Sequence, residues 1–107
     1  MYTYSAYVTG VYDGDTITVD IDLGFDIILK NQKIRLVGIN APEVRGITRE
    51  DGIKSRNRLR ELILKKKITL ETIKDKKEKY GRFLGKIYLN GVYINDQLIS
   101  EGFAQQY

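Results

Sequence analysis

Cysteine and histidine are both absent from this sequence of 107 residues. The lack of cysteine excludes disulfide frameworks, zinc ribbons and thiol nucleophiles. The lack of histidine excludes histidine bases, histidine-ligated transition metals and Ser-His-Asp triads. Acid–base chemistry is therefore left to carboxylates, lysine or tyrosine, and we expect any metal to be a hard, oxygen-ligated cation such as calcium or magnesium.

Long apolar segments and targeting signals are also missing. No apolar run approaches the ~20 residues of a membrane span. The first ten residues lack the basic flank and apolar stretch of a signal peptide. We therefore expect no membrane partner and a cytoplasmic location by default, or secretion if the chain is a processed form.

The composition that remains is typical of a globular domain. Hydrophobic residues make up 42% of the chain, which has eight tyrosines and a single proline, so strand-forming residues are abundant. The length suits a single domain over residues 1–107, which we expect to be monomeric. The net charge of +4 favours anionic partners, although many unrelated proteins share such an excess.

Alternating hydrophobic residues and turn-forming pairs predict a mainly antiparallel β structure. Strands are expected at residues 2–12, 16–21, 23–29, 34–39, 68–73, 83–89 and 92–94. Turns are expected at Asp13-Gly14-Asp15, Asn31-Gln32 and Asn90-Gly91, the last being a strong hairpin signal. A charged segment, residues 74–79, follows the fifth of these strands.

Two helices are predicted. Leu59, Leu62 and Ile63 share one face of a long helix at about residues 50–66. Asn95 or Asp96 is expected to cap a short final helix that ends at Gly102. The order of elements indicates an α+β fold: a small five-stranded Greek-key barrel of the OB type, with the long helix after the third strand and a short C-terminal helix.

Three segments contain residues suited to chemistry, and each has a plain structural alternative. Residues 11–16 place two carboxylates at a turn, which can offer oxygen ligands to a cation or can simply be a β-turn. Residues 34–43 carry one arginine in an apolar strand before Asn40 and Pro42. That arginine needs either a bound anion or a structural carboxylate partner, because an unpaired buried charge is costly.

The third segment is Lys79-Tyr80-Gly81-Arg82. A guanidinium group can hold a phosphate through two parallel hydrogen bonds, and a tyrosine ring offers a face to a base. The alternative is a basic surface turn.

Together and in this order, the three segments resemble the motifs of the staphylococcal nuclease family. That family has an Asp-Gly-Asp-Thr turn, an Arg-Leu-x-Gly-Ile/Val-Asp-Thr/Ala-Pro-Glu strand end and a Lys-Tyr-Gly-Arg turn. Its large helix lies between the second and third motifs. Residues 102–107 also resemble its Gly-Leu-Ala segment before a tyrosine, so the resemblance covers roughly residues 5–107.

The resemblance implies a calcium-dependent nuclease acting on DNA or RNA, preferably single-stranded or frayed, with products that end in a 3′-phosphate. Asp15 and Asn40 match the positions of side-chain ligands to calcium, and Ala41 that of a backbone carbonyl ligand. Asp13 is expected just behind these ligands.

The resemblance also implies the catalytic groups. Arg35 and Arg82 match the two guanidinium groups that hold the scissile phosphate. Glu43 matches the general base for the attacking water. Lys79, Tyr80 and Tyr107 match positions beside the nucleotide, with a different local spacing before Tyr107.

The chain departs from the family pattern in three places. Asn40 stands where the family usually has aspartate, and an amide oxygen still ligates calcium but brings no charge. The stretch between Asp15 and Arg35 is longer, which we interpret as longer strands around Gly24. We also expect no counterpart of the further C-terminal helix of long family members.

Two other functions are compatible with these features. A barrel of this kind can bind nucleic acid or protein without cleavage, as do family domains that have lost the site residues. The basic stretches 54–67 and 74–79 can form an interaction or membrane surface, although acidic residues dilute both.

Overall fold

A computed structural model describes residues 2–77 and 79–107. The strands are β1 (Tyr2–Asp13), β2 (Thr16–Asp22), β3 (Ile28–Leu36), β4 (Ile39–Asn40), β5 (Lys67–Lys77), β6 (Phe83–Leu89), β7 (Val92–Tyr93) and β8 (Gln105–Gln106). The helices are the 3₁₀ turn η1 (Gly46–Thr48), α1 (Arg49–Ile63) and α2 (Ile94–Ser100). No helix within the described residues has the length and apolar character needed to cross a bilayer.

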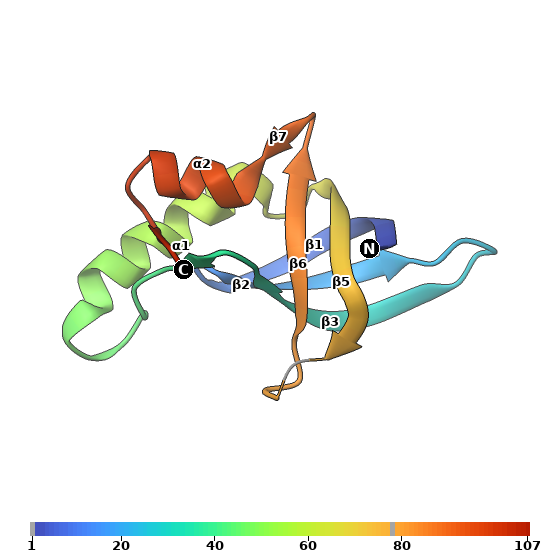
Figure 1. The fold of residues 1–107 in the computed structure, drawn as a ribbon, viewed down its shortest axis with the longest axis horizontal. Coiled ribbons are helices and arrows are strands. Elements are labelled where there is room, and N and C mark those ends of the chain that lie inside the picture. The colour runs from blue at the N-terminus through green and yellow to red at the C-terminus, as the bar shows by residue number, and fades with distance from the viewer. Residues whose placement is uncertain (1, 78) are drawn as a thin grey trace.

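Five strands form a closed barrel in the order β3-β2-β1-β5-β6, and parallel pairing between β3 and β6 closes it. The other neighbouring pairs in the barrel are antiparallel. Strand β7 extends the sheet beside β6, and β4 pairs separately with β8. The predicted OB-type barrel, with a long helix after the third long strand and a short helix near the C-terminus, is confirmed (Figure 1).

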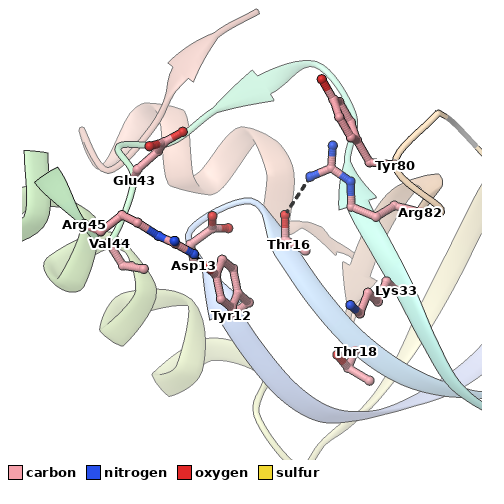
Figure 2. A pocket seen from close by; sticks show the side chains of 10 residues that line it. All are labelled: Tyr12, Asp13, Thr16, Thr18, Lys33, Glu43, Val44, Arg45, Tyr80 and Arg82. Atoms are coloured by element: carbon pink, nitrogen blue, oxygen red, sulfur yellow. Dashed lines mark hydrogen bonds between the residues drawn. The ribbon is translucent and has the colours of Figure 1, made fainter.

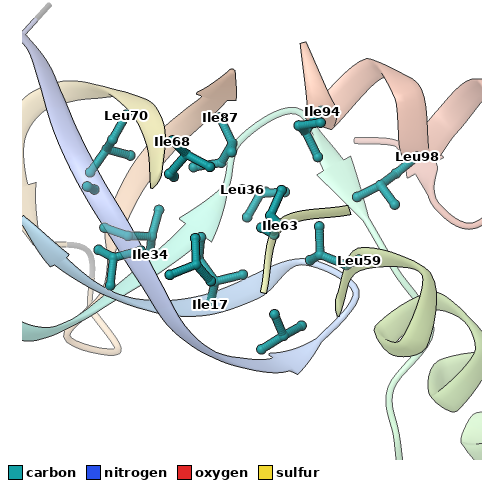
Figure 3. Packing of buried hydrophobic residues seen from close by; sticks show 14 of the residues in the cluster. Ile17, Ile34, Leu36, Leu59, Ile63, Ile68, Leu70, Ile87, Ile94 and Leu98 are labelled. Atoms are coloured by element: carbon teal, nitrogen blue, oxygen red, sulfur yellow. The ribbon is translucent and has the colours of Figure 1, made fainter. Parts of the chain in front are cut away.

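Both helices contribute to the barrel core. Leu59 and Ile63 of α1 and Leu98 of α2 are fully buried with apolar residues of the strands (Figure 3). Leu62 is partly buried against the same cluster, so the predicted face of α1 is confirmed. This packing fixes α1 against the end of the barrel where the β1–β2 turn lies.

The predicted turn at Asn31-Gln32 is wrong. The chain reverses at residues 23–27, which include Gly24 at φ 79°, while β3 runs without a break through Asn31. Asn31 has φ 56° and sits at a bulge in the β2–β3 ladder, where its N–H donates to Asp20 Oδ1 at 3.0 Å. Asparagine tolerates positive φ in a bulge as readily as in a turn, and this explains the error.

The boundaries near both helices also differ from the prediction. Helix α1 ends at Ile63 because Lys65 adopts φ 58° and the chain pairs with Val8 of β1. Helix α2 starts at Ile94 without a side-chain cap. Asn95 is instead buried and bonds Ile87 N, Val37 O and Gly85 O, so its polar groups serve the barrel rather than the helix end.

Other expectations near the C-terminal half hold. The Asn90-Gly91 hairpin is confirmed, with both residues at positive φ, and Gly102 at φ 82° follows the end of α2. Of the charged segment 74–79, residues 74–77 belong to β5, and residue 78 lies outside the described residues.

Candidate active site

Asp15 is a buried carboxylate at the β1–β2 turn, with 6% of its surface exposed. Its Oδ2 accepts a hydrogen bond from Ala41 N at 2.9 Å, and its Oδ1 accepts one from the Thr16 hydroxyl at 3.2 Å. A Cβ at Gly14 would lie 2.7 Å from Ala41 Cβ and 2.8 Å from Ser55 Cβ, so only glycine permits this approach. The turn is thereby held against both the segment after β4 and helix α1.

Arg35 lies beside Asp15 because it is the register partner of Thr16 across β2 and β3. Its guanidinium donates to Leu36 O at 2.6 Å and to Asn40 Oδ1 at 3.3 Å, and lies 3.4 Å from Asp15 Oδ2. Arg35 is therefore paired with a structural carboxylate, which was one of the two alternatives for it. That carboxylate is also the predicted calcium ligand.

The C-terminal segment completes this cluster. Tyr107 N donates to Gly38 O at 3.0 Å, and β8 pairs with β4 just before it. The Tyr107 ring centre lies 5.9 Å from the Arg35 guanidinium carbon, and the side chain is 85% exposed. The structure thus brings Asp15, Arg35, Asn40, Ala41 and Tyr107 together.

A pocket of about 710 Å³ adjoins the cluster (Figure 2). Glu43 lies on one side of it, and Arg82 and Tyr80 lie on the other. The Arg82 guanidinium donates to Thr16 Oγ1 at 3.3 Å, so the Thr16 hydroxyl bridges Arg82 and the Asp15 carboxylate. Arg35 is not among the residues that line the pocket. Thr16 therefore connects the Asp15–Arg35 cluster to the residues of the pocket.

Lys79 and Tyr80, two of the predicted nucleotide-contacting residues, form a cation–π contact, and Tyr80 lines the pocket. The exposed Tyr80 ring has the Arg82 guanidinium carbon 5.4 Å and Lys79 Nζ 5.0 Å from its centre.

Several lining residues received no role from the sequence: Tyr12, Thr16, Thr18, Lys33, Val44 and Arg45. Thr16 and Thr18 are two residues apart and therefore share the outer face of β2, and Lys33 is the register partner of Thr18. The alternating pattern of β2 could thus have indicated that the two threonines lie together. Arg45 donates to the Tyr12 hydroxyl across a sequence separation of 33 residues, which no local pattern reveals.

Asp13 and Asp15 interact through their carboxyl groups. Burial, followed by the hydrogen bond and charge of Asp15, raises the pKa of Asp13 from 3.8 to about 6. Asp13 Oδ1 also accepts from Asp15 N at 3.1 Å, which supports the turn. Among residues 2–77 and 79–107, no three acidic side chains are grouped so that they could hold a metal ion.

Comparison with known proteins identifies the family. A family model described as "Staphylococcal nuclease homologue" matches residues 33–107. The chain belongs to the staphylococcal nuclease family. Thermonucleases from Staphylococcus hyicus and Staphylococcus intermedius are each 34% identical to it, over 92% and 94% of this chain. Endonuclease YhcR of Bacillus subtilis (strain 168) is 31% identical over 97% of this chain.

These relatives are longer proteins. The matched region covers 56% and 58% of the two thermonucleases and 9% of YhcR. This member of the staphylococcal nuclease family therefore spans little more than half of the first two.

Gly52 of α1 holds the Glu43 segment in place. A Cβ at this position would lie 2.0 Å from Glu43 O and 2.7 Å from Val44 N. Glycine to alanine in a helix ordinarily stabilises by about 0.5–1 kcal/mol. We predict that Gly52→Ala instead lowers the free energy of unfolding by about 1–3 kcal/mol, because the Glu43 backbone must move.

Urea titration measures this effect, with Asn57→Ala on the exposed part of the same helix as control. The control should stay within about 0.5 kcal/mol of the wild type. A stabilising Gly52→Ala substitution would contradict the close approach of α1 to Glu43.

Proposed function

We propose that this chain is a calcium-dependent nuclease that hydrolyses phosphodiester bonds of DNA or RNA. Membership of the staphylococcal nuclease family and relatives named thermonuclease and endonuclease support a nuclease. The observation that carries the proposal is the position of the Thr16 hydroxyl, which hydrogen-bonds both Asp15 and Arg82. Asp15 lies beside Arg35, and Arg82 lines the same pocket as Glu43.

Calcium fits the available donors. Asp15 offers a carboxylate, Asn40 an amide oxygen and Ala41 a backbone carbonyl, and all three are the hard oxygen ligands that calcium prefers. Asp15 Oδ2 and Asn40 Oδ1 both approach the same Arg35 nitrogen, at 3.4 and 3.3 Å, so they face a common point. When bound, calcium would supply positive charge to the oxygens of the phosphate.

The two arginines would stabilise the increased negative charge of the phosphorane-like transition state. Both guanidinium groups stay charged at any working pH, and their planar fork matches phosphate better than lysine does. One well-placed donor of this kind is often worth about 3–4 kcal/mol. Arg82 already lies at the pocket wall. Arg35 lies beside Asp15, which is the residue before Thr16 in the sequence.

Glu43 would act as the general base. Its carboxylate lines the pocket and is exposed to solvent, where it can take the proton of an attacking water. With no histidine in the chain, a carboxylate is the available base near neutral pH. The Thr48 hydroxyl donates to Glu43 O at 3.0 Å and helps to fix this position.

The alternative is a barrel that binds nucleic acid without cleaving it. Asn40 favours this alternative, because the site has one charge fewer than the family's usual ligand set. Glu43, Arg35 and Arg82 favour an enzyme, since a binding protein needs no base beside a phosphate site.

Replacing the proposed base tests the reaction. We predict that single-stranded DNA is cleaved with calcium, that chelator abolishes cleavage, and that Glu43→Gln reduces the rate at least about 100-fold. Glu50→Gln, an exposed substitution on α1, is the control and should retain the wild-type rate. Undiminished cleavage with chelator or with Glu43→Gln would remove the mechanism; binding without any wild-type cleavage would favour the alternative.

Restoring the missing charge tests the metal site. One extra charge near calcium is worth at most about 4 kcal/mol at an effective dielectric near 20, and about 1–2 kcal/mol remains after desolvation. We predict that Asn40→Asp lowers the half-saturating calcium concentration roughly 5–30-fold. The measurement is a calcium titration of the cleavage rate, and an unchanged midpoint would contradict the role of Asn40 as a ligand.

A further inference from the structure

The pocket has a second aromatic–cation pair opposite Tyr80 and Arg82. Tyr12 is the residue before the end of strand β1, Arg45 lies two residues after Glu43, and the Arg45 guanidinium donates to the Tyr12 hydroxyl. Tyr12 lies across the pocket from Tyr80, with Thr16 between them (Figure 2). The Tyr12 side chain is 52% exposed and the Tyr80 side chain is 68% exposed, so both offer ring surface to a ligand.

The pocket between the two pairs has polar and cationic groups suited to a phosphodiester chain. Thr18 and Lys33 are register partners on the outer face of β2 and β3, and both line the pocket beyond Thr16. Lysine and arginine bind the backbone of a polyanion, and an aromatic ring binds a base of any sequence by stacking. The wall with Tyr12 and Arg45 therefore repeats the chemistry proposed for Tyr80 and Arg82, and Lys33 lies on the side of Arg82 (Figure 2).

The hydrogen bond to Arg45 does not by itself explain why the Tyr12 ring is exposed at the pocket. Its hydroxyl holds Arg45, but its ring is half exposed at the mouth of a pocket rather than packed in the core. The hydrogen bond orients the ring and keeps the guanidinium at the same wall. A fixed ring loses little conformational freedom on binding a base, which favours affinity.

We infer that Tyr12 and Arg45 form a second nucleotide subsite, in which a base stacks on the Tyr12 ring and its phosphate contacts Arg45. The inference rests on the proposed function, because it places nucleotides on both sides of the scissile phosphate: one at Tyr80 and its neighbour at Tyr12. The ligand class is a single-stranded oligonucleotide with unpaired bases.

The test separates stacking from charge by measuring binding without cleavage. The dissociation constant of the full chain is measured in chelator by fluorescence anisotropy, for a short oligothymidylate and for an abasic oligomer of equal length. Tyr12→Ala should weaken binding of oligothymidylate about tenfold more than it weakens binding of the abasic oligomer, which loses only the hydrogen bond that holds Arg45. Tyr12→Phe, which keeps the ring, should stay within about threefold for both.

Tyr7→Ala is the matched control, since Tyr7 is 43% exposed on the same strand but does not line this pocket. It should leave both dissociation constants unchanged. Equal affinity of Tyr12→Ala and wild type for oligothymidylate would overturn the subsite, and so would an equal loss for both oligomers.

Arg45→Gln provides an independent test should Tyr12→Ala fail to fold. It should weaken binding of both oligomers and reduce the slope of log affinity against log salt by about one. An unchanged slope would overturn the contact between Arg45 and phosphate. Because these measurements need no cleavage, an inactive wild type would contradict the proposed function and leave the subsite to be decided by binding.

Discussion

The burial of the Asp15 carboxylate is the constraint on which the rest of the site depends. A buried charge is costly unless it is paired and hydrogen-bonded, and Asp15 meets this requirement with Ala41 N, the Thr16 hydroxyl and the Arg35 guanidinium. These partners come from β2, β3 and the segment after β4. The contacts that stabilise the buried Asp15 carboxylate therefore also bring Thr16, Arg35 and Ala41 together.

Closure of the barrel brings the second arginine to this point. Parallel pairing of β3 with β6 sets Arg35 opposite Leu84, two residues after Arg82. The Thr16 hydroxyl then links Arg82 to Asp15. Helix α1 supports the opposite wall, because Gly52 packs directly on the backbone of Glu43. The carboxylates of Asp15 and Glu43 and the guanidinium groups of Arg35 and Arg82, from distant parts of the chain, thus border one region.

Much of this arrangement was predictable from local signals, and the failures have physical reasons. The period of two in β2 and the apolar face of α1 fixed the core residues correctly. Asn31 and Asn95 misled the prediction because asparagine serves a bulge or a buried network as well as a turn or a cap. The Tyr12–Arg45 pair escaped prediction because tertiary folding alone brings these residues together. The site residues were assigned through ordered motifs, since no single segment distinguished chemistry from an ordinary turn.

In the proposed mechanism, both arginines and one divalent cation surround a single phosphate. The most direct measurement is a crystal structure of the chain with calcium and an uncleavable phosphorothioate dinucleotide. We expect calcium on Asp15 and Asn40, with the Arg35 and Arg82 guanidinium groups both contacting oxygens of the same phosphate. A phosphate bound elsewhere, with Arg35 still donating to Leu36 O and turned away from the ligand, would contradict this mechanism.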